Sequence, residues 1–283
     1  MNTTIAVLIT CHNRREKTIS CLHALYSCKL PENHTLDIFL VDDGSSDGTS
    51  EAVKTTFPEV NLIKGDGNLY WNRGMYLAWI SAIKKKDFDF YLWLNDDTMI
   101  FKESLSLMLE FSLTINNKRI IIGATCSAVS GAGTYGGFIF PDKRVSPNDN
   151  WQDCDFFNGN IVLIPSYVFQ KVGLLDKHFH HSLGDMDYGM RASKLGFVHC
   201  LAPNFLGTCE EHEIDPTWRN PNSPFFKRLK HLYSPSGNNP FESFIFERRH
   251  NGLYLSIVRF FSNHLRAVLP RLWKQGSSFK NDK

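Results

Sequence analysis

The chain has 283 residues, of which 42% are hydrophobic and 21% are charged, so it can bury a sizeable core and has the composition of a soluble globular protein. A formal net charge of +2 is too small to indicate a nucleic-acid-binding protein. The seven cysteines are scattered without a CxxC pair, and no stretch is long enough for a signal peptide or a membrane span. These features exclude a zinc or disulfide framework and predict a cytoplasmic protein.

The first half of the chain alternates apolar strands with amphipathic helices. Strands are expected at four places: residues 4–10, 36–41, 60–63 and 90–94. A helix is expected between each pair of consecutive strands. Asn13 is expected to cap the first helix and Ser46 or Asp47 the second, and the third is expected to span residues 71–86. This order predicts an open parallel sheet with helices on both faces, in which ligands bind at the carboxyl ends of the strands.

The second half is less regular. Further strands are expected at residues 120–126, 160–164 and 197–202, with a glycine-rich hairpin turn at 130–138. A short helix is expected to begin at Asp185 and to end at Gly196. After Pro203 the sequence is rich in proline and is expected to form loops, until a final segment, 241–273, mixes apolar residues with arginines.

Three of the four expected strands in the first half end in polar residues that suit a ligand. These ends are Thr10-Cys11-His12-Asn13, Asp42-Asp43-Gly44-Ser45 and Asn95-Asp96-Asp97. Because the carboxyl ends of parallel strands lie on one edge of the sheet, we expect all three to meet on one rim.

Asp96 and Asp97 are hard oxygen ligands placed directly after a strand, which suits Mg²⁺ or Mn²⁺ holding a diphosphate. A turn with a helix cap explains the same residues equally well. Asp42 and Asp43 repel each other, so they favour a metal or the hydrogen-bond donors of a nucleotide. A capped helix after them accounts for Ser46 and Asp47 but not for this pair.

Asp185 and Asp187 form a third acidic cluster at the start of the short helix. One interpretation is a general base that takes a proton from an incoming hydroxyl group. The other is a helix cap, since carboxylates are favourable at a helix amino end. A helix amino end lowers the pKa of a carboxylate. Apolar neighbours would have to raise the pKa of Asp185 again if it acts as a base.

The ordered set of these motifs resembles glycosyltransferase family 2, the inverting nucleotide-sugar-dependent enzymes with the GT-A fold. The resemblance covers about residues 4–210. Within the family, the sequence resembles bacterial cell-surface polysaccharide enzymes such as rhamnosyltransferase-like members. Its parts are Thr10-Cys11-His12-Asn13-Arg14 after the first strand, "VDDGSSDGT", "GNLYWNRGM", "LNDDT" and "GDMDYGMRASKLGF". It implies a GT-A catalytic domain at residues 1–215, with a nucleotide-sugar-binding half at about 1–100 and an acceptor half at about 101–215.

The resemblance also implies roles for individual residues. Asp97 matches the main metal ligand, for Mg²⁺ or Mn²⁺, and Asp185 matches the base that deprotonates the acceptor. The positions that match contacts to the nucleotide-sugar donor are Thr10, Asn13, Asp42, Asp43, Asn68, Arg73 and Asp96. The donor would be a UDP-, dTDP- or GDP-linked sugar, and the acceptor a saccharide or lipid-linked saccharide.

The sequence departs from the family pattern at two positions. Gly184 stands where the family has the Glu before its base, and Asn95 replaces the first Asp of the metal-binding DxD motif. A further metal ligand is left open between Cys209, His212 and neither.

The remaining segment, 216–283, is expected to be a C-terminal extension. Residues 244–283 contain eight Lys/Arg against Glu247 and Asp282, and the apolar residues recur at helical spacing. Basic amphipathic helices of this kind lie on anionic membranes, which would bring the enzyme to a lipid-linked acceptor at the inner face of the cell membrane. Packing of this helix on the catalytic domain is an equal alternative.

Two other functions fit parts of the sequence. A sugar nucleotidyltransferase also uses acidic residues on a parallel sheet, but it would need a glycine-rich phosphate loop after the first strand, and residues 10–14 contain no glycine. A non-catalytic nucleotide-sugar-binding subunit would bind the donor without turnover. Gly184 is the feature that favours it.

Overall fold

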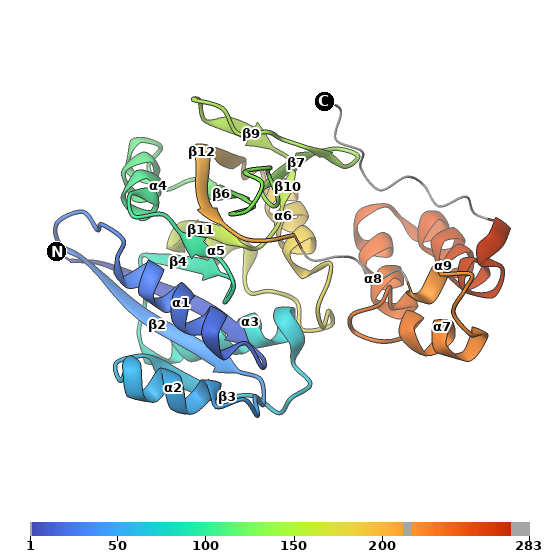
Figure 1. Ribbon diagram of the computed structural model, residues 1–283. Coiled ribbons are helices and arrows are strands. Elements are labelled where there is room, and N and C mark those ends of the chain that lie inside the picture. Colours follow the sequence, from blue (N-terminus) through green and yellow to red (C-terminus); the bar gives the residue numbers. More distant parts are fainter. Residues whose placement is uncertain (1, 212–216, 273–283) are drawn as a thin grey trace. The chain divides into compact units, whose positions relative to one another are not determined.

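The computed structural model describes residues 2–211 and 217–272, and the chain divides into two compact units, Met1–His212 and Glu213–Lys283 (Figure 1). Among the described residues, no helix combines the length and the hydropathy that crossing a bilayer requires.

The first unit begins with the expected alternation of strands and helices. Its first seven elements are β1 (Thr3–Cys11), α1 (Arg15–Tyr26), β2 (His34–Asp42), α2 (Thr49–Thr56), β3 (Asn61–Lys64), α3 (Tyr70–Lys85) and β4 (Phe90–Leu94). The remaining elements are β5 (Met99–Ile100), α4 (Ser104–Thr114), β6 (Ile120–Cys126), β7 (Gly137–Ile139), β8 (Lys143–Arg144), β9 (Gln152–Cys154), β10 (Phe156–Phe157), β11 (Ile161–Pro165), α5 (Ser166–Val172), α6 (Gly184–Lys194) and β12 (His199–Thr208).

The central sheet has the strand order β3-β2-β1-β4-β11-β6-β12-β5, with β9 paired to β12. Strands β1 to β4 are mutually parallel, whereas β11 runs antiparallel to both β4 and β6. The register pairs Cys11 with Asp42 and Asp42 with Lys64. The carboxyl ends of β1, β2 and β3 are therefore level with one another.

Apolar side chains fill both faces of the sheet, because alternate residues of a strand point to opposite sides. In β1, Ile5, Val7 and Ile9 join a cluster with the buried residues of α1, α2 and α4, while Ala6 and Leu8 join a cluster with those of α3, α5 and α6. Figure 1 shows helices on the two sides of the sheet. The expected α/β architecture is confirmed.

Two expected helix caps are wrong. Helix α1 begins at Arg15 without a side-chain cap, since Asn13 adopts a φ of 49° and its carboxamide accepts from the backbone N–H of Ser46 instead. The side chain of Asp47 does accept from Thr49 N–H, but Gly48 occupies the cap position of α2. Both side chains connect loops of neighbouring strands, which sequence spacing alone does not reveal.

The second unit is helical: η1 (Thr217–Arg219), α7 (Phe225–Leu232), α8 (Pro240–His250), α9 (Leu253–Val268) and η2 (Pro270–Leu272). The expectation of loops between Pro203 and residue 241 is wrong, because β12 continues to Thr208 and η1 and α7 follow within this stretch. Pro224 precedes α7 and Pro240 occupies the first position of α8, where a missing N–H costs no hydrogen bond. These prolines mark helix starts.

Candidate functional site

The loops that follow β1 and β2 are joined by reciprocal hydrogen bonds. Asn13 donates its backbone N–H to Ser45 Oγ at 2.9 Å and accepts at Oδ1 from Ser46 N–H at 2.8 Å. Arg15 N–H donates to Asp47 Oδ2 at 3.0 Å. These bonds hold two of the three predicted polar strand ends together at one edge of the sheet.

The adjacent Asp42 and Asp43 avoid mutual repulsion because their carboxylates serve different loops. Asp42 accepts from Ser45 N–H at 2.9 Å and from the Ser50 hydroxyl, so it organises the turn into α2. Asp43 accepts three backbone N–H groups, from Gly67 and Leu69 at 2.8 Å and from Tyr70 at 2.9 Å.

The loop at residues 65–70 is therefore folded around the Asp43 carboxylate. Gly65 lies so close to it that an added Cβ would stand 2.6 Å from Asp43 Oδ1 and 2.9 Å from Asp43 Cα. This contact fixes the start of α3 against the end of β2. It is a structural role for Asp43 that the sequence did not indicate, and the expected contacts of Asp42 and Asp43 to a nucleotide stay predictions.

Asp96 and Asp97 form the third strand end and share a guanidinium group. Arg14 Nη1 lies 3.2 Å from Asp96 Oδ1 and 2.9 Å from Asp97 Oδ2, and both carboxylates are buried. Burial raises the pKa of Asp96 to about 7, although the positive charge of Arg14 opposes the shift. Arg14 was part of the sequence motif, but no role was predicted for it.

The Asp97 carboxylate also contacts Cys209. Its Oδ1 accepts from Cys209 Sγ at 3.5 Å, and Asn160 Nδ2 lies 3.6 Å from the same sulfur. Burial, followed by the nearby charge of Asp97, raises the pKa of Cys209 to about 12, so the thiol stays protonated. A neutral thiol is a poor ligand for Mg²⁺ or Mn²⁺, whereas a carboxylate suits both ions.

The donor set for a metal ion is accordingly small. Within residues 2–211 and 217–272, no three His, Cys, Asp or Glu side chains cluster as a metal site, and His212 lies outside the described residues. Asp97 is a hard ligand on a rigid strand end, and an ion there would need oxygens from a bound diphosphate to complete its coordination. The residues fit a cation that arrives with a nucleotide.

Asp185 lies in the first turn of α6, as expected. Its Oδ2 accepts from Gly159 N–H at 3.0 Å and its Oδ1 from Met186 N–H at 2.8 Å. Protein atoms displace water around the carboxylate, and this desolvation raises the pKa of Asp185 against the opposing effect of the two N–H groups. A raised pKa is what a general base near neutral pH requires.

Asp187 is two residues away and has a different role. Its buried carboxylate accepts from Arg191 Nε at 2.8 Å, and the Arg191 guanidinium also donates to the carbonyl oxygens of Val172 and Leu174. This ion pair attaches α6 to the end of α5. Asp187 is part of the scaffold.

The segment 159–160 connects the base candidate to the Asp96–Asp97 pair. Gly159 donates to Asp185, while the carbonyl oxygen of Asn160 accepts from Asn95 N–H at 3.1 Å. Trp71 Nε1 donates to Asn95 Oδ1 at 2.7 Å from the first turn of α3, which begins at the loop around Asp43. The three acidic patches are thus joined by one network of short contacts.

The other residues expected to bind the donor lie around this network. Thr10 is buried with its hydroxyl against the backbone of α3 at Gly74, Asn68 is exposed, and Arg73 Nε donates to the carbonyl oxygen of Lys177 at 2.9 Å. Their contacts to a donor stay predictions.

Asn72 was missed by the sequence reasoning. Its Nδ2 donates to the carbonyl oxygens of Asp176 and Phe179 at 2.8 and 2.7 Å, and its own backbone N–H donates to His180 O at 2.9 Å. Within the described residues, its buried Oδ1 has no hydrogen-bond partner. Asn72 thereby fixes the chain that leads into α6 against α3.

The side chain of Asn72 explains why Gly184 stands where the family pattern has a Glu. A Cβ at this position would stand 1.8 Å from Asn72 Oδ1 and 2.4 Å from Asn72 Cγ. A Glu before Asp185 is therefore incompatible with Asn72 in its present position.

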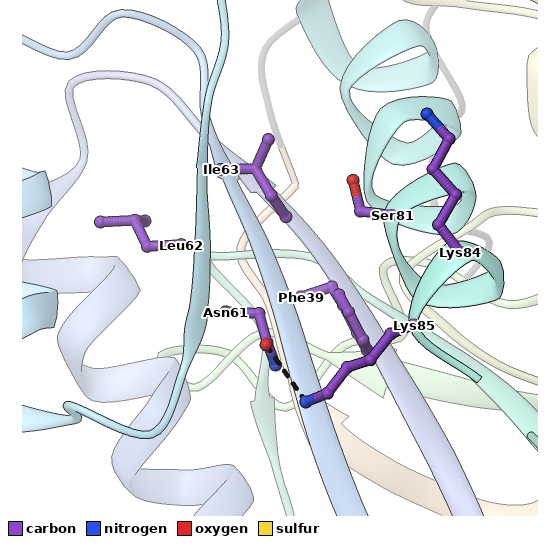
Figure 2. A pocket seen from close by; sticks show the side chains of 7 residues that line it. All are labelled: Phe39, Asn61, Leu62, Ile63, Ser81, Lys84 and Lys85. Atoms are coloured by element: carbon purple, nitrogen blue, oxygen red, sulfur yellow. Dashed lines mark hydrogen bonds between the residues drawn. The ribbon is translucent and has the colours of Figure 1, made fainter.

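A hollow elsewhere on the first unit lacks these chemical groups. Figure 2 shows it between α3 and the edge of the sheet at β3, with Lys84, Lys85 and Asn61 among the lining residues. Lys85 Nζ is engaged by Asp37 at 2.8 Å and by Asn61 at 3.2 Å. The lysines lie in the last turn of α3, at the opposite end of this helix from the loop around Asp43.

Comparison with known proteins identifies relatives of this chain. The sequence model of a family described as Glycosyl transferase family 2 matches residues 6–158. An uncharacterized glycosyltransferase of Rickettsia typhi is 25% identical over 179 residues, which are 58% of this chain and 52% of that protein. The chain thus spans about half the length of the curated relatives it matches.

Two solved structures resemble the fold. The mannosyltransferase PcManGT from Pyrobaculum calidifontis, in complex with GDP-Man and Mn²⁺, has a TM-score of 0.58 and 14% identity, covering 96% of this chain and 74% of its own. S. aureus TarS 1–349 in complex with UDP has a TM-score of 0.55 and 14% identity, covering 95% and 87%. This likeness confirms the expected GT-A fold.

The contact between Gly184 and Asn72, next to the candidate base Asp185, can be tested by its effect on stability. We expect Gly184→Ala to destabilise the protein by about 1–3 kcal/mol, the usual cost of overpacking, because Asn72 is held by two hydrogen bonds and cannot easily yield. Asn72→Ala should also destabilise it. The double variant should be more stable than the sum of the two changes predicts, as measured by denaturant unfolding. Strict additivity would contradict this account of the contact.

Proposed function

The chain belongs to glycosyl transferase family 2, and on that premise we propose that it transfers a sugar from a nucleotide-diphospho-sugar to a hydroxyl group of a saccharide, with inversion at the anomeric carbon. The observation that carries this proposal is the contact network that joins Asp185 to the Asp96–Asp97 pair through Gly159 and Asn160. We assign the base to one end of this network and the phosphate-binding position to the other.

In this proposal, Asp185 removes the proton of the acceptor hydroxyl group while the oxygen of that hydroxyl group attacks the anomeric carbon. The bond from that carbon to the diphosphate breaks on the opposite face, so the configuration inverts and no covalent sugar–enzyme intermediate forms. The hydrogen bonds from Gly159 and Met186 hold the carboxylate in place. Its raised pKa makes it a stronger base than an ordinary aspartate.

The leaving diphosphate gains negative charge as the bond breaks. A Mg²⁺ or Mn²⁺ ion held by Asp97 would neutralise that charge, and the relative solved with GDP-Man and Mn²⁺ supports this choice of ion. Arg14 places a positive charge against the same carboxylates. Asp43, Asp42, Thr10, Asn13, Asn68, Arg73 and Asp96 are proposed to hold the nucleotide and the sugar.

The donor is proposed to be a UDP-, dTDP- or GDP-linked sugar, since the structural relatives were solved with UDP and with GDP-Man. The acceptor is proposed to be a saccharide, including one carried on a lipid, in the synthesis of a cell-surface polysaccharide. The resemblance of the motifs to bacterial enzymes of that process supports this role. The reaction would then take place in the cytoplasm, at the inner face of the membrane.

The role of Asp185 is tested by Asp185→Asn. We expect this change to lower transfer by about 10²- to 10⁴-fold, because the amide cannot accept the proton, while donor binding is retained. Asp153→Asn, at an exposed carboxylate paired with Arg119, is the matched control and should transfer normally.

Product analysis distinguishes the outcomes of this test. Unchanged transfer in Asp185→Asn would show that another residue is the base. Donor binding by the wild-type protein without turnover would favour a binding subunit, and release of pyrophosphate from a nucleoside triphosphate and a sugar phosphate would favour a nucleotidyltransferase.

The metal site is tested by thermal shift with a panel of UDP-, dTDP- and GDP-sugars, each with Mn²⁺ or with a chelator. A true donor should raise the melting temperature more with Mn²⁺, because an ion held by Asp97 would offset the negative charge of the diphosphate. Asp97→Ala should remove the metal-dependent part of the shift, and Asp153→Ala should keep it. Equal stabilisation by the donor with a chelator would contradict metal dependence.

The raised pKa of Asp185 predicts the pH dependence of transfer. The base acts as a carboxylate, so kcat/KM should fall as the pH falls through a pKa above the ordinary value of about 4. The Asp96→Asn variant should show the same fall in kcat/KM at low pH. This result would exclude the titration of Asp96 as its cause. A rate that stays constant to a pH below about 4 would contradict the assignment.

A further inference from the structure

The second unit concentrates exposed apolar side chains. More than half of the large apolar residues exposed in the described part of the chain lie within residues 217–272, although this is the smaller unit. Phe226 and Tyr254 are 80% and 78% exposed. Scattered surface apolar residues need no explanation, but such a concentration indicates a binding surface.

Helix α9 has its apolar side turned to solvent. The residues it buries are small or polar, namely Ser256, Asn263 and Ala267. The opposite side consists of large exposed residues: Tyr254, Ile257, Val258, Phe261, Leu265 and Val268. At 100° per residue these two sets lie on opposite sides of the helix, which reverses the usual burial pattern of an amphipathic helix.

Polar contacts fasten the inward side of α9 within its own unit. The buried Arg228 of α7 donates from Nε to the carbonyl oxygen of Ala267 at 2.7 Å. The Tyr233 hydroxyl lies 2.6 Å from His264 Nε2, and Arg259 forms an ion pair with the buried Glu247 of α8. The apolar side of α9 is therefore not needed to hold this helix in the unit.

The exposed charges of the described part of this unit, residues 217–272, are positive. Its acidic residues within 217–272 are Glu242 and Glu247, and both are buried. The exposed cations of the same residues are Arg219, Lys227, Lys230, Arg248, Arg259 and Arg271. Two copies of this unit would both carry this positive charge, whereas an anionic lipid surface offers both negative head groups and an apolar interior.

We propose that the exposed side of α9, defined by Tyr254, Ile257, Val258, Phe261, Leu265 and Val268, binds an anionic lipid bilayer with the helix lying in the plane of the surface. The helix has 16 residues and is about 24 Å long, which is too short to span a hydrocarbon core of about 30 Å. The cations of the unit bind the phosphate head groups. This surface is distinct from the acidic rim, so the proposal does not depend on the transfer activity.

The test is flotation of the full-length protein, without donor, with vesicles of phosphatidylcholine alone or mixed with phosphatidylglycerol. Binding should require the anionic lipid and weaken as salt is raised. Phe261→Ser combined with Leu265→Ser should lower the partition coefficient at least about tenfold, because two apolar side chains no longer enter the interface.

Matched controls separate this effect from a general loss of surface apolarity. Phe101→Ser combined with Leu113→Ser removes exposed residues of the same two types from the first unit and should bind vesicles like the wild type. Lys227→Gln combined with Lys230→Gln should weaken binding to anionic vesicles more than about tenfold, without changing the melting temperature.

Three results would overturn the proposal. The first is a wild-type protein that does not float with anionic vesicles. The second is a stable oligomer, seen by light scattering without lipid, that Phe261→Ser with Leu265→Ser converts to monomers. The third is a lower melting temperature of that variant with unchanged vesicle binding, which would mean that this side of α9 packs within the chain.

Discussion

The carboxylates on the rim of the sheet are almost out of contact with water, so each needs a partner that offsets the cost of removing its charge from solvent. The chain meets this constraint in two ways. Asp43 is surrounded by backbone N–H groups of the loop before α3, and the Asp96–Asp97 pair shares the Arg14 guanidinium. Both solutions use groups from neighbouring loops, and this is why those loops have defined positions around the rim.

The two aspartates of α6 show how local surroundings divide roles between identical side chains. Asp187 is neutralised by Arg191 and ties α6 to α5, whereas Asp185 accepts two backbone N–H groups in a desolvated setting. Desolvation raises the pKa of Asp185, as expected for a carboxylate that acts as a base. Position in the fold, more than position in the sequence, distinguishes Asp185 as the candidate base.

The sequence was sufficient to predict the alternating half of the sheet and its acidic rim, because short apolar strands and carboxyl-end motifs carry strong local signals. It was insufficient for Asn13, whose carboxamide bonds to a loop 33 residues away, and for Asn72, whose partners lie more than 100 residues away. The apolar spacing of α9 was visible, but spacing alone does not say which side faces inward. That depends on polar partners such as Arg228, which only the folded unit brings together.

The guanidinium of Arg14 has a consequence for how the protein matures. Metal sites built from several unpaired carboxylates resist closure until their ion arrives, and such chains can fold only as fast as metal is supplied. Here the Arg14 guanidinium already offsets part of the negative charge of the acidic pair. The folded chain can therefore hold these two carboxylates together before any ligand binds.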